Sequence, residues 1–125
     1  MDLKLLHTEK APAAVGPYSQ GVQVGDLVFT SGQLPADPGT GELKTEIKEA
    51  TKQSLENVKA ILEEAGTTMD KVVKVMIFVK NMDDFADVNE VYGEYFSDHK
   101  PARACVEVAA LPKGAVVEIE AIALK

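Results

Sequence analysis

The sequence predicts an α+β protein with a single mixed β-sheet and two α-helices packed on one face of it. Two segments repeat apolar residues at helical spacing, and several short segments are rich in β-branched residues. These elements follow one another in the order ββαβαββ, with a further strand expected near Leu3–Leu6. Strands and helices mixed in this way favour a two-layer sandwich of sheet and helices.

The first two strands of this order are expected within residues 21–34. The stretch "GVQVGDLVFTSGQL" has two apolar runs around Gly25-Asp26, which is a turn signal. The next residues, 35–43, are dense in Pro, Gly and Asp, so they predict a loop.

The first helix is expected over residues 45–66. Acidic Glu46 and Glu49 suit its first turn, and Gly66 suits its C-terminal end. The apolar residues that recur at helical spacing are Ile47, Ala50, Leu55, Val58, Ile61, Leu62 and Ala65. This segment is therefore expected to bury one face against the sheet.

The second half of the chain predicts a strand over residues 71–80 and a helix over residues 82–99 that ends before Pro101. Two further strands, 102–111 and 115–124, flank the turn "PKG". The apolar stripe of the second helix consists of Phe85, Val88, Tyr92, Tyr95 and Phe96.

Alternation along the strands predicts which side chains lie under the helices. On the 71–80 strand these are Val73, Val75, Ile77 and Val79, whereas Lys74, Met76, Phe78 and Lys80 point the other way. If Met76, Phe78 and Phe29 lie on the face without helices, they form a large apolar patch, and such patches mark partner surfaces. We therefore expect a homo-oligomer that covers this second face.

The chain of 125 residues is expected to form one domain, residues 1–125, with a sizeable core. Its net charge is −7, and its 13 Lys and Arg are scattered among 20 Asp and Glu. Tight binding of nucleic acid usually needs a basic stripe that neutralises phosphates, so nucleic acid is not an expected partner.

Neither membrane association nor secretion is expected from the sequence. No apolar run approaches the roughly 20 residues of a membrane helix, and "MDLKLLHTEK" lacks the apolar core of a signal peptide. The single cysteine, Cys105, cannot form an internal disulfide. These features predict a cytoplasmic protein.

Arg103 is the only arginine of the chain, and it lies near the start of the 102–111 strand. Arginine offers a planar fork that holds a carboxylate through two parallel hydrogen bonds, which lysine cannot do. Two interpretations remain open at this point: an internal or inter-subunit salt bridge to an Asp or Glu, or a clamp for a ligand.

Glu118 and Glu120 alternate with apolar residues and so share one face of the last strand. If this strand pairs with the 102–110 strand, one of the two carboxylates lies near Arg103. A solvated or salt-bridged strand face is the more common situation for a single strand glutamate.

Cys105 lies two residues after Arg103, on the same face of a regular strand. A catalytic thiolate normally needs a neighbouring base such as histidine, and no motif ties His7 or His99 to Cys105. A small packed thiol is therefore expected, and no Cys/His metal site is expected either.

Four other residues have an ordinary interpretation beside a functional one. Tyr18 lies in a turn-prone segment, where packing with a wet hydroxyl is expected. Ser31 lacks the sequence context of a hydrolase nucleophile, although Gly32 after it would let a ligand approach the backbone. Asn89 lies in the second helix, where solvation explains most such residues.

Five segments together resemble the RidA/YjgF family of reactive-intermediate deaminases, from about residue 8 to the C-terminus. They are "APAAVGPYSQGV", "FTSGQLPADPGTGEL", "QSLENVKAILEEAG", "IFVKNMDDFADVNEVYGEYF" and "PARACVEVAALPKGAVVEIEAIA". The most specific part is P-A-R-x-C followed by V-E-I. Lys100 departs from the pattern, since relatives usually carry an aromatic or apolar residue there.

The resemblance implies a chorismate-mutase-like fold and a homotrimer with three sites in clefts between subunits. It implies hydrolysis of 2-aminoacrylate/2-iminopropanoate and 2-aminocrotonate/2-iminobutanoate to 2-keto acids and ammonia, without cofactor or metal. Some relatives are instead described as endoribonucleases or translation inhibitors. A third possibility is a regulatory module that binds 2-keto acids without turnover.

The resemblance also assigns roles to individual residues. It implies that Arg103 clamps the substrate carboxylate, that Glu118 orients the attacking water, and that the backbone carbonyl of Cys105 helps to hold this water. The remaining positions that match the family's substrate pocket are Tyr18, Ser31, Gly32 and Asn89.

Overall fold

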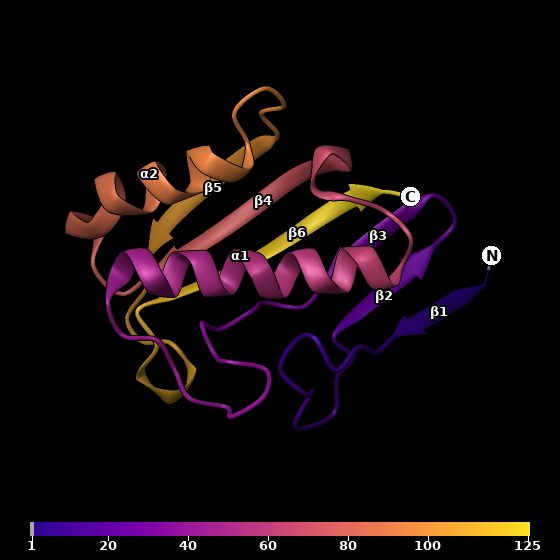
Figure 1. Cartoon of the computed structure of the whole chain (residues 1–125), viewed down its shortest axis with the longest axis horizontal. Helices are drawn as coiled ribbons and strands as arrows, with labels where there is room; N and C mark the ends of the chain where they lie inside the picture. The colour runs from indigo at the N-terminus through magenta and orange to yellow at the C-terminus, as the bar shows by residue number, and fades with distance from the viewer. Residues whose placement is uncertain (1) are drawn as a thin grey trace.

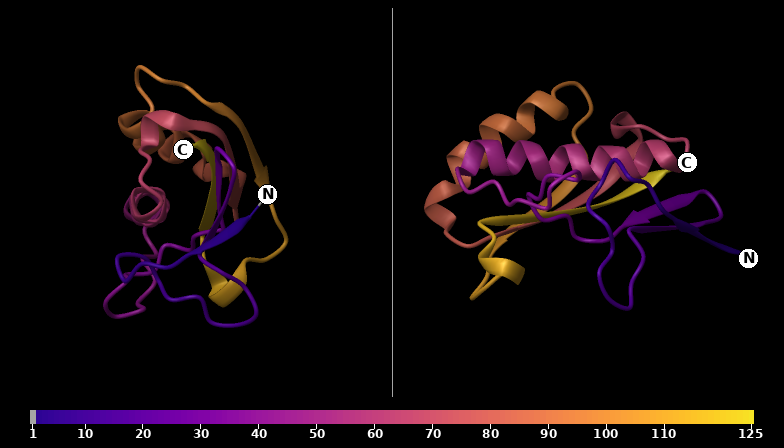
Figure 2. Two further views of the ribbon diagram at one scale, coloured as in Figure 1. Left: turned by 90° about the vertical axis from the view of Figure 1, so that its right-hand side faces the viewer. Right: turned by 60° about the horizontal axis from the view of Figure 1, so that its bottom comes forward.

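In the computed structural model, which describes residues 2–125, six strands form one sheet and two helices lie on one of its faces (Figures 1 and 2). The helices are α1 (Ile47–Glu64) and α2 (Phe85–Tyr95). The strands are β1 (Leu3–Leu6), β2 (Gly21–Val24), β3 (Leu27–Thr30), β4 (Val72–Val79), β5 (Ala102–Glu107) and β6 (Val117–Leu124). The mixed α+β class and the strand near the N-terminus are confirmed.

The strands lie in the order β1-β2-β3-β6-β4-β5. Among the strands of the described residues, β4 and β5 are the one parallel pair, and α2 forms the crossover between them. The last strand, β6, lies between β3 and β4 and pairs with both. The condition considered above, a pairing of the last strand with the 102–110 strand, is not met, because β4 separates β6 from β5.

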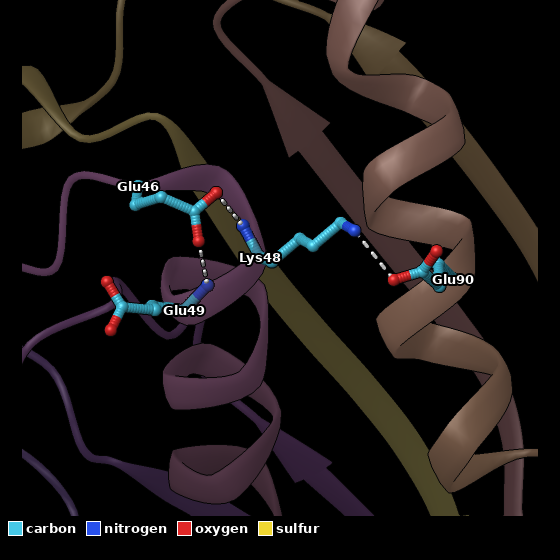
Figure 3. A network of polar contacts seen from close by, with 4 residues as sticks. All are labelled: Glu46, Lys48, Glu49 and Glu90. Atoms are coloured by element: carbon cyan, nitrogen blue, oxygen red, sulfur yellow. Dashed lines mark hydrogen bonds and ion pairs between the residues drawn. The ribbon is translucent and has the colours of Figure 1, made fainter.

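Helix α1 confirms the amphipathic pattern and begins two residues later than expected. The Glu46 carboxylate caps it by accepting hydrogen bonds from the N–H groups of Lys48 and Glu49, at 2.9 and 3.1 Å (Figure 3). These bonds lower the pKa of Glu46. At the other end Gly66 adopts a φ of 86°, which suits a glycine after a helix.

Helix α2 is shorter than the predicted 82–99 segment. A 3₁₀ turn, Met82–Asp84, precedes it, and the helix ends at Tyr95 rather than next to Pro101. Two contacts join α2 to α1. The Lys48 ammonium lies 2.8 Å from the Glu90 carboxylate (Figure 3), and the Tyr95 hydroxyl donates to Glu56 at 2.5 Å.

The core lies between the helices and the face of the sheet that they cover. It confirms Val75, Ile77 and Val79 as helix-facing residues, since each is at most 1% exposed. Val73 was expected among them, and this was wrong: it is 39% exposed, whereas Val72 is fully buried. An irregularity between Val72 and Lys74 shifts the register of β4, so Val72 takes the inward position.

Within residues 2–125, neither α1 nor α2 packs on the other face of the sheet (Figure 2, left). The strand register places Phe29, Met76 and Phe78 on this face, as expected, and each is partly exposed. More exposed apolar residues continue the face: Leu3, Leu5, Leu27, Val106 and Leu124. We call this surface the open face. None of the helices within residues 2–125 is both long and apolar enough to cross a membrane.

Gly21 on β2 allows α1 to approach the sheet closely. A Cβ at this position would lie 2.7 Å from Cγ2 of Ile61 and 3.0 Å from the carbonyl oxygen of Phe29. We expect Gly21→Ala to lower the free energy of unfolding by about 1–3 kcal/mol, because overpacking forces the helix and the sheet apart. Urea denaturation measures this change.

Gly93→Ala in α2 is the matched control, since a Cβ added there would meet no neighbouring atom within 4 Å. It should raise the stability by about 0.5–1 kcal/mol through helix propensity. Equal destabilisation by both substitutions would contradict the close approach at Gly21.

Candidate active site

A cavity of about 450 Å³ lies at the edge of the open face. The loop before β2, the residues that follow β3, and the Pro112–Gly114 turn with the start of β6 form its walls. Four of the predicted site residues line this cavity: Tyr18, Ser31, Gly32 and Glu118. We call these four residues the glutamate group.

Glu118 is the acidic residue of this cavity. It lies opposite Phe78 in the β4–β6 ladder, so its side chain is on the open face. Partial burial raises the pKa of Glu118, and the neighbouring Glu120 carboxylate raises it further. A raised pKa brings a carboxyl group closer to neutral pH, which favours its use in proton transfer.

Gly32 makes room for the Glu118 carboxyl group. A Cβ at Gly32 would lie 2.8 Å from Cδ and 3.0 Å from Oε2 of Glu118, closer than side-chain atoms approach a real Cβ. The sequence suggested that this glycine exposes backbone to a ligand. The structure gives a further reason for it, namely contact with the catalytic candidate Glu118.

Ser31 and Tyr18 differ in how firmly they are held. The Ser31 hydroxyl donates to the carbonyl of Ser19 at 2.5 Å, and the Ser31 N–H donates to the carbonyl of Gln20 at 2.8 Å. Its hydroxyl proton is thus engaged within the chain. Tyr18 is 53% exposed and remains open to a ligand or a partner chain.

Gln20 shapes the cavity, and sequence reasoning missed it. It is 2% exposed, and its amide accepts from the N–H of Thr8 at 2.7 Å and donates to the carbonyl of Pro12 at 2.8 Å. These bonds fix the loop that carries Tyr18. No signal in a single sequence distinguishes such a glutamine from a solvated one, because its partners are all backbone groups.

Arg103 lies in a different place, on the helix-covered face of edge strand β5. It pairs with buried Val75, so its side chain points under α2. Its Nη1 donates to Oδ1 of Asn89 at 2.6 Å. The guanidinium carbon lies 4.8 Å from the ring centroid of Tyr92 and 5.5 Å from that of Phe85.

Within residues 2–125, no Asp or Glu forms an ion pair with Arg103. The interpretation of Arg103 as part of an internal salt bridge is therefore wrong for this chain. The cation keeps N–H donors that Asn89 does not use, since a guanidinium carries five. Asn89 contacts the arginine, and the predicted contact of Asn89 with the substrate stays a prediction.

Cys105 follows Arg103 on the same face and is half-buried. Burial raises the pKa of its thiol, and this outweighs the opposite effect of the Arg103 charge. The protonated thiol is favoured at neutral pH, as for a packed cysteine rather than a nucleophile. Asn89, Arg103 and Cys105 form what we call the arginine group.

The chain does not bring these two groups together. Arg103 and Glu118 lie on opposite faces of the sheet, and β4 separates their strands. Two strand spacings amount to about 10 Å along the sheet alone. The expectation that a carboxylate of the last strand lies beside Arg103 is therefore wrong within one chain. Residues 2–125 also contain no cluster of three His, Cys, Asp or Glu side chains suited to a metal ion.

The raised pKa of Glu118 predicts a pH-dependent stability change in Glu118→Gln. Folding favours the protonated form, so the charged form carries a cost that is present above the folded pKa and absent below the unfolded pKa. We expect Glu118→Gln to be more stable than the wild type near pH 7. Chemical denaturation at several pH values should show this gain shrink as the pH falls through the folded pKa of Glu118.

Glu9→Gln, at an exposed turn position outside the helices, is the control for the removal of one carboxylate charge, and the gain is read as the difference between the two variants at each pH. A stability difference for Glu118→Gln that stays constant from acid to neutral pH would contradict the raised pKa.

Comparison with known sequences supports the resemblance over nearly the whole chain. The family model described as Endoribonuclease L-PSP matches residues 8–125. A RutC family protein of Pyrococcus abyssi is 55% identical over 126 residues, which cover 100% of this chain and 99% of that protein. The 2-iminobutanoate/2-iminopropanoate deaminase of Salmonella typhimurium is 53% identical over 125 residues, 98% of each chain.

Solved structures agree with this result. The YjgF gene product from E. coli is 50% identical with a TM-score of 0.94, covering 98% of each chain. E. coli TdcF with bound serine is 47% identical, also with a TM-score of 0.94 and 98% of each chain. The chain therefore belongs to the Endoribonuclease L-PSP family, which its sequence motifs identified as RidA/YjgF.

Proposed function

We propose that the protein hydrolyses 2-iminopropanoate and 2-iminobutanoate, the imine tautomers of 2-aminoacrylate and 2-aminocrotonate, to 2-keto acids and ammonia. The relative of Salmonella typhimurium is named for this activity, which supports the proposal at the level of the family. The observation that carries it is Arg103, a half-buried cation without a carboxylate partner within residues 2–125.

In this proposal the arginine group of one copy and the glutamate group of a neighbouring copy form one site. The positions of Arg103 and Glu118 on opposite faces support this, because one chain cannot bring both to a four-carbon substrate. Contact between two different surfaces is heterologous, and it forms a ring when the rotation between neighbouring copies closes. The resemblance implies a ring of three, and the apolar open face is a surface that such an assembly would cover.

The substrate carboxylate binds to the free N–H groups of Arg103 in this site. A fork of two parallel hydrogen bonds fixes both oxygens and therefore the direction of C2. The solved structure of E. coli TdcF is described as having bound serine, a small molecule with the same type of carboxylate. This neighbour supports a small amino-acid-like ligand for the present chain.

Hydrolysis then needs only water and proton transfer. A water molecule held by Glu118 adds its oxygen to C2, the electron pair of the C=N bond moves to nitrogen, and Glu118 takes a proton from the water. Glu118 returns this proton to the nitrogen, which gives the neutral carbinolamine. The hydroxyl proton of the carbinolamine then passes through Glu118 to the same nitrogen, the C–N bond breaks with its electron pair on nitrogen, and ammonia leaves while the oxygen becomes the keto group. Water and proton transfer account for every bond in this reaction and no atom is oxidised or reduced overall, so the proposal includes no redox cofactor.

The chain's other nucleophile candidates fit this scheme without a covalent role. An imine carbon is already electrophilic, so a water molecule suffices to attack it. The thiol form of Cys105 is favoured, and the Ser31 hydroxyl is bonded to Ser19. The backbone carbonyl of Cys105 remains a proposed second acceptor for the water, and Tyr18 a proposed wall of the site.

Arg103→Lys tests the carboxylate clamp, because it keeps the charge and removes the fork. We expect kcat/KM to fall at least about a hundredfold, or on the order of 3 kcal/mol. A coupled assay measures it, with a PLP-dependent serine or threonine dehydratase supplying the imine. Near-normal turnover by Arg103→Lys, with unchanged thermal unfolding, would refute the clamp.

The same assay separates the other two interpretations from this proposal. A regulatory module would bind a 2-keto acid but leave the rate of imine decay unchanged. An endoribonuclease would cleave RNA in a manner abolished by Arg103→Ala while showing no effect on the imine. Loss of imine that depends on Arg103 identifies the deaminase.

Mixed oligomers test whether the site lies between copies. Chains with Arg103→Ala and chains with Glu118→Ala are each expected to be nearly inactive. After joint unfolding and refolding at equal amounts, about a quarter of the interfaces of a ring should carry an intact residue from each side. We therefore expect about a quarter of the wild-type activity.

Homogeneous refolded samples of each variant provide the baseline for this experiment. Mixed oligomers that are no more active than these samples would contradict a site formed by Arg103 of one copy and Glu118 of another.

A further inference from the structure

Three residues on one face of α2 contact the Arg103 guanidinium. Phe85, Asn89 and Tyr92 are spaced by four and then three residues, so they lie on the same side of the helix. All three contact the guanidinium: the two rings approach its central carbon to 5.5 and 4.8 Å, and Asn89 accepts from Nη1 at 2.6 Å.

These contacts hold a cation without neutralising it. The face of an aromatic ring attracts a guanidinium electrostatically but takes none of its N–H donors. Asn89 takes one donor and carries no charge. A carboxylate in the same place would occupy the fork and cancel the charge, which would leave nothing for a ligand.

We propose that Tyr92 and Phe85 are positioning residues that hold the plane of the Arg103 guanidinium, so that its free N–H groups meet an incoming carboxylate. The consequence for catalysis rests on the proposed function. The alignment itself is a property of the folded chain and can be measured without a substrate.

The ring of Tyr92, rather than its hydroxyl, carries this role. Tyr92 is 8% exposed, and its hydroxyl has no hydrogen-bond partner within residues 2–125. A hydroxyl hidden in this way cannot reach a ligand in solvent. The ring, by contrast, lies against both Arg103 and Phe96, whose ring centroid is 4.7 Å away.

Helix α1 supports the position of α2. The ion pair of Lys48 with Glu90 and the hydrogen bond of Tyr95 with Glu56 join the two helices on either side of Tyr92. Tyr95 therefore offers a matched control: it is an aromatic residue of the same helix that contacts Glu56, not Arg103.

The first experiment observes Arg103 directly. Because the chain has one arginine, ¹⁵N-arginine labelling gives side-chain NMR signals of Arg103 alone. We expect hindered rotation of the guanidinium in the wild type, in Tyr92→Phe and in Tyr95→Leu, and faster rotation in Tyr92→Leu. Guanidinium rotation in Tyr92→Leu that is as slow as in the wild type overturns the proposal.

The second experiment measures the kinetic effect of the ring. We expect Tyr92→Leu to raise KM about tenfold with a smaller change in kcat, and Tyr92→Phe to restore most of this loss. Tyr95→Leu should lower the melting temperature while leaving KM within about twofold of the wild type. A similar KM for Tyr92→Leu and Tyr95→Leu overturns the proposal.

A second variant and the substrate-free NMR measurement separate a failure of the positioning role from a failure of folding or of the proposed function. Phe85 is 37% exposed, so Phe85→Leu remains a usable second variant if Tyr92→Leu does not fold, with the same expected direction in both experiments. A wild-type protein that does not hydrolyse imines refutes the proposed function only. The NMR comparison then still decides whether the rings align Arg103.

Discussion

The half-buried guanidinium of Arg103 is the feature on which the rest of the site depends. A cation under a helix is normally paired with a carboxylate, since burial of an unpaired charge is costly. Here two ring faces and one amide oxygen take the place of that carboxylate. They stabilise the charge while leaving hydrogen-bond donors free, which is the state that an anion-binding residue requires.

The topology of the sheet explains why this arrangement is possible. The parallel unit β4–α2–β5 places α2 above edge strand β5, so side chains of β5 on the covered face meet one helix only. Deeper in the sheet, the same face is filled by Val75, Ile77 and Val79. Only at the edge can a charged group lie under a helix and still remain near solvent.

Glu118 is also a partly buried ionisable group, but burial favours its neutral form, whereas Arg103 stays charged. Its carboxyl group lies on the open face beside Gly32, and partial burial favours its neutral form. A carboxyl group with a raised pKa destabilises the fold at neutral pH, and a half-buried arginine without a carboxylate partner also costs stability. Such costs in stability, for Glu118 and for Arg103, are typical of residues that take part in chemistry. In a site shared between two copies, both residues would gain interaction partners when substrate binds.

The sequence by itself determined the α+β class, the two helices and the face of the sheet that they leave uncovered. These features follow from the local spacing of apolar residues, which alternate along strands and recur every three or four residues along helices. It also singled out Arg103, the one arginine among lysines, and the pair Glu118 and Glu120, which alternate with apolar residues. The family resemblance chose Glu118 from this pair.

Only the tertiary structure decided how these residues are related in space. The insertion of β6 between β3 and β4 removed the expected contact between Glu118 and Arg103, and the bulge in β4 exchanged Val73 for Val72. Strand order and bulges depend on pairing between distant segments, which periodicity does not encode. For the same reason the roles of Gln20 and Tyr92 became visible only once their distant partners were in place.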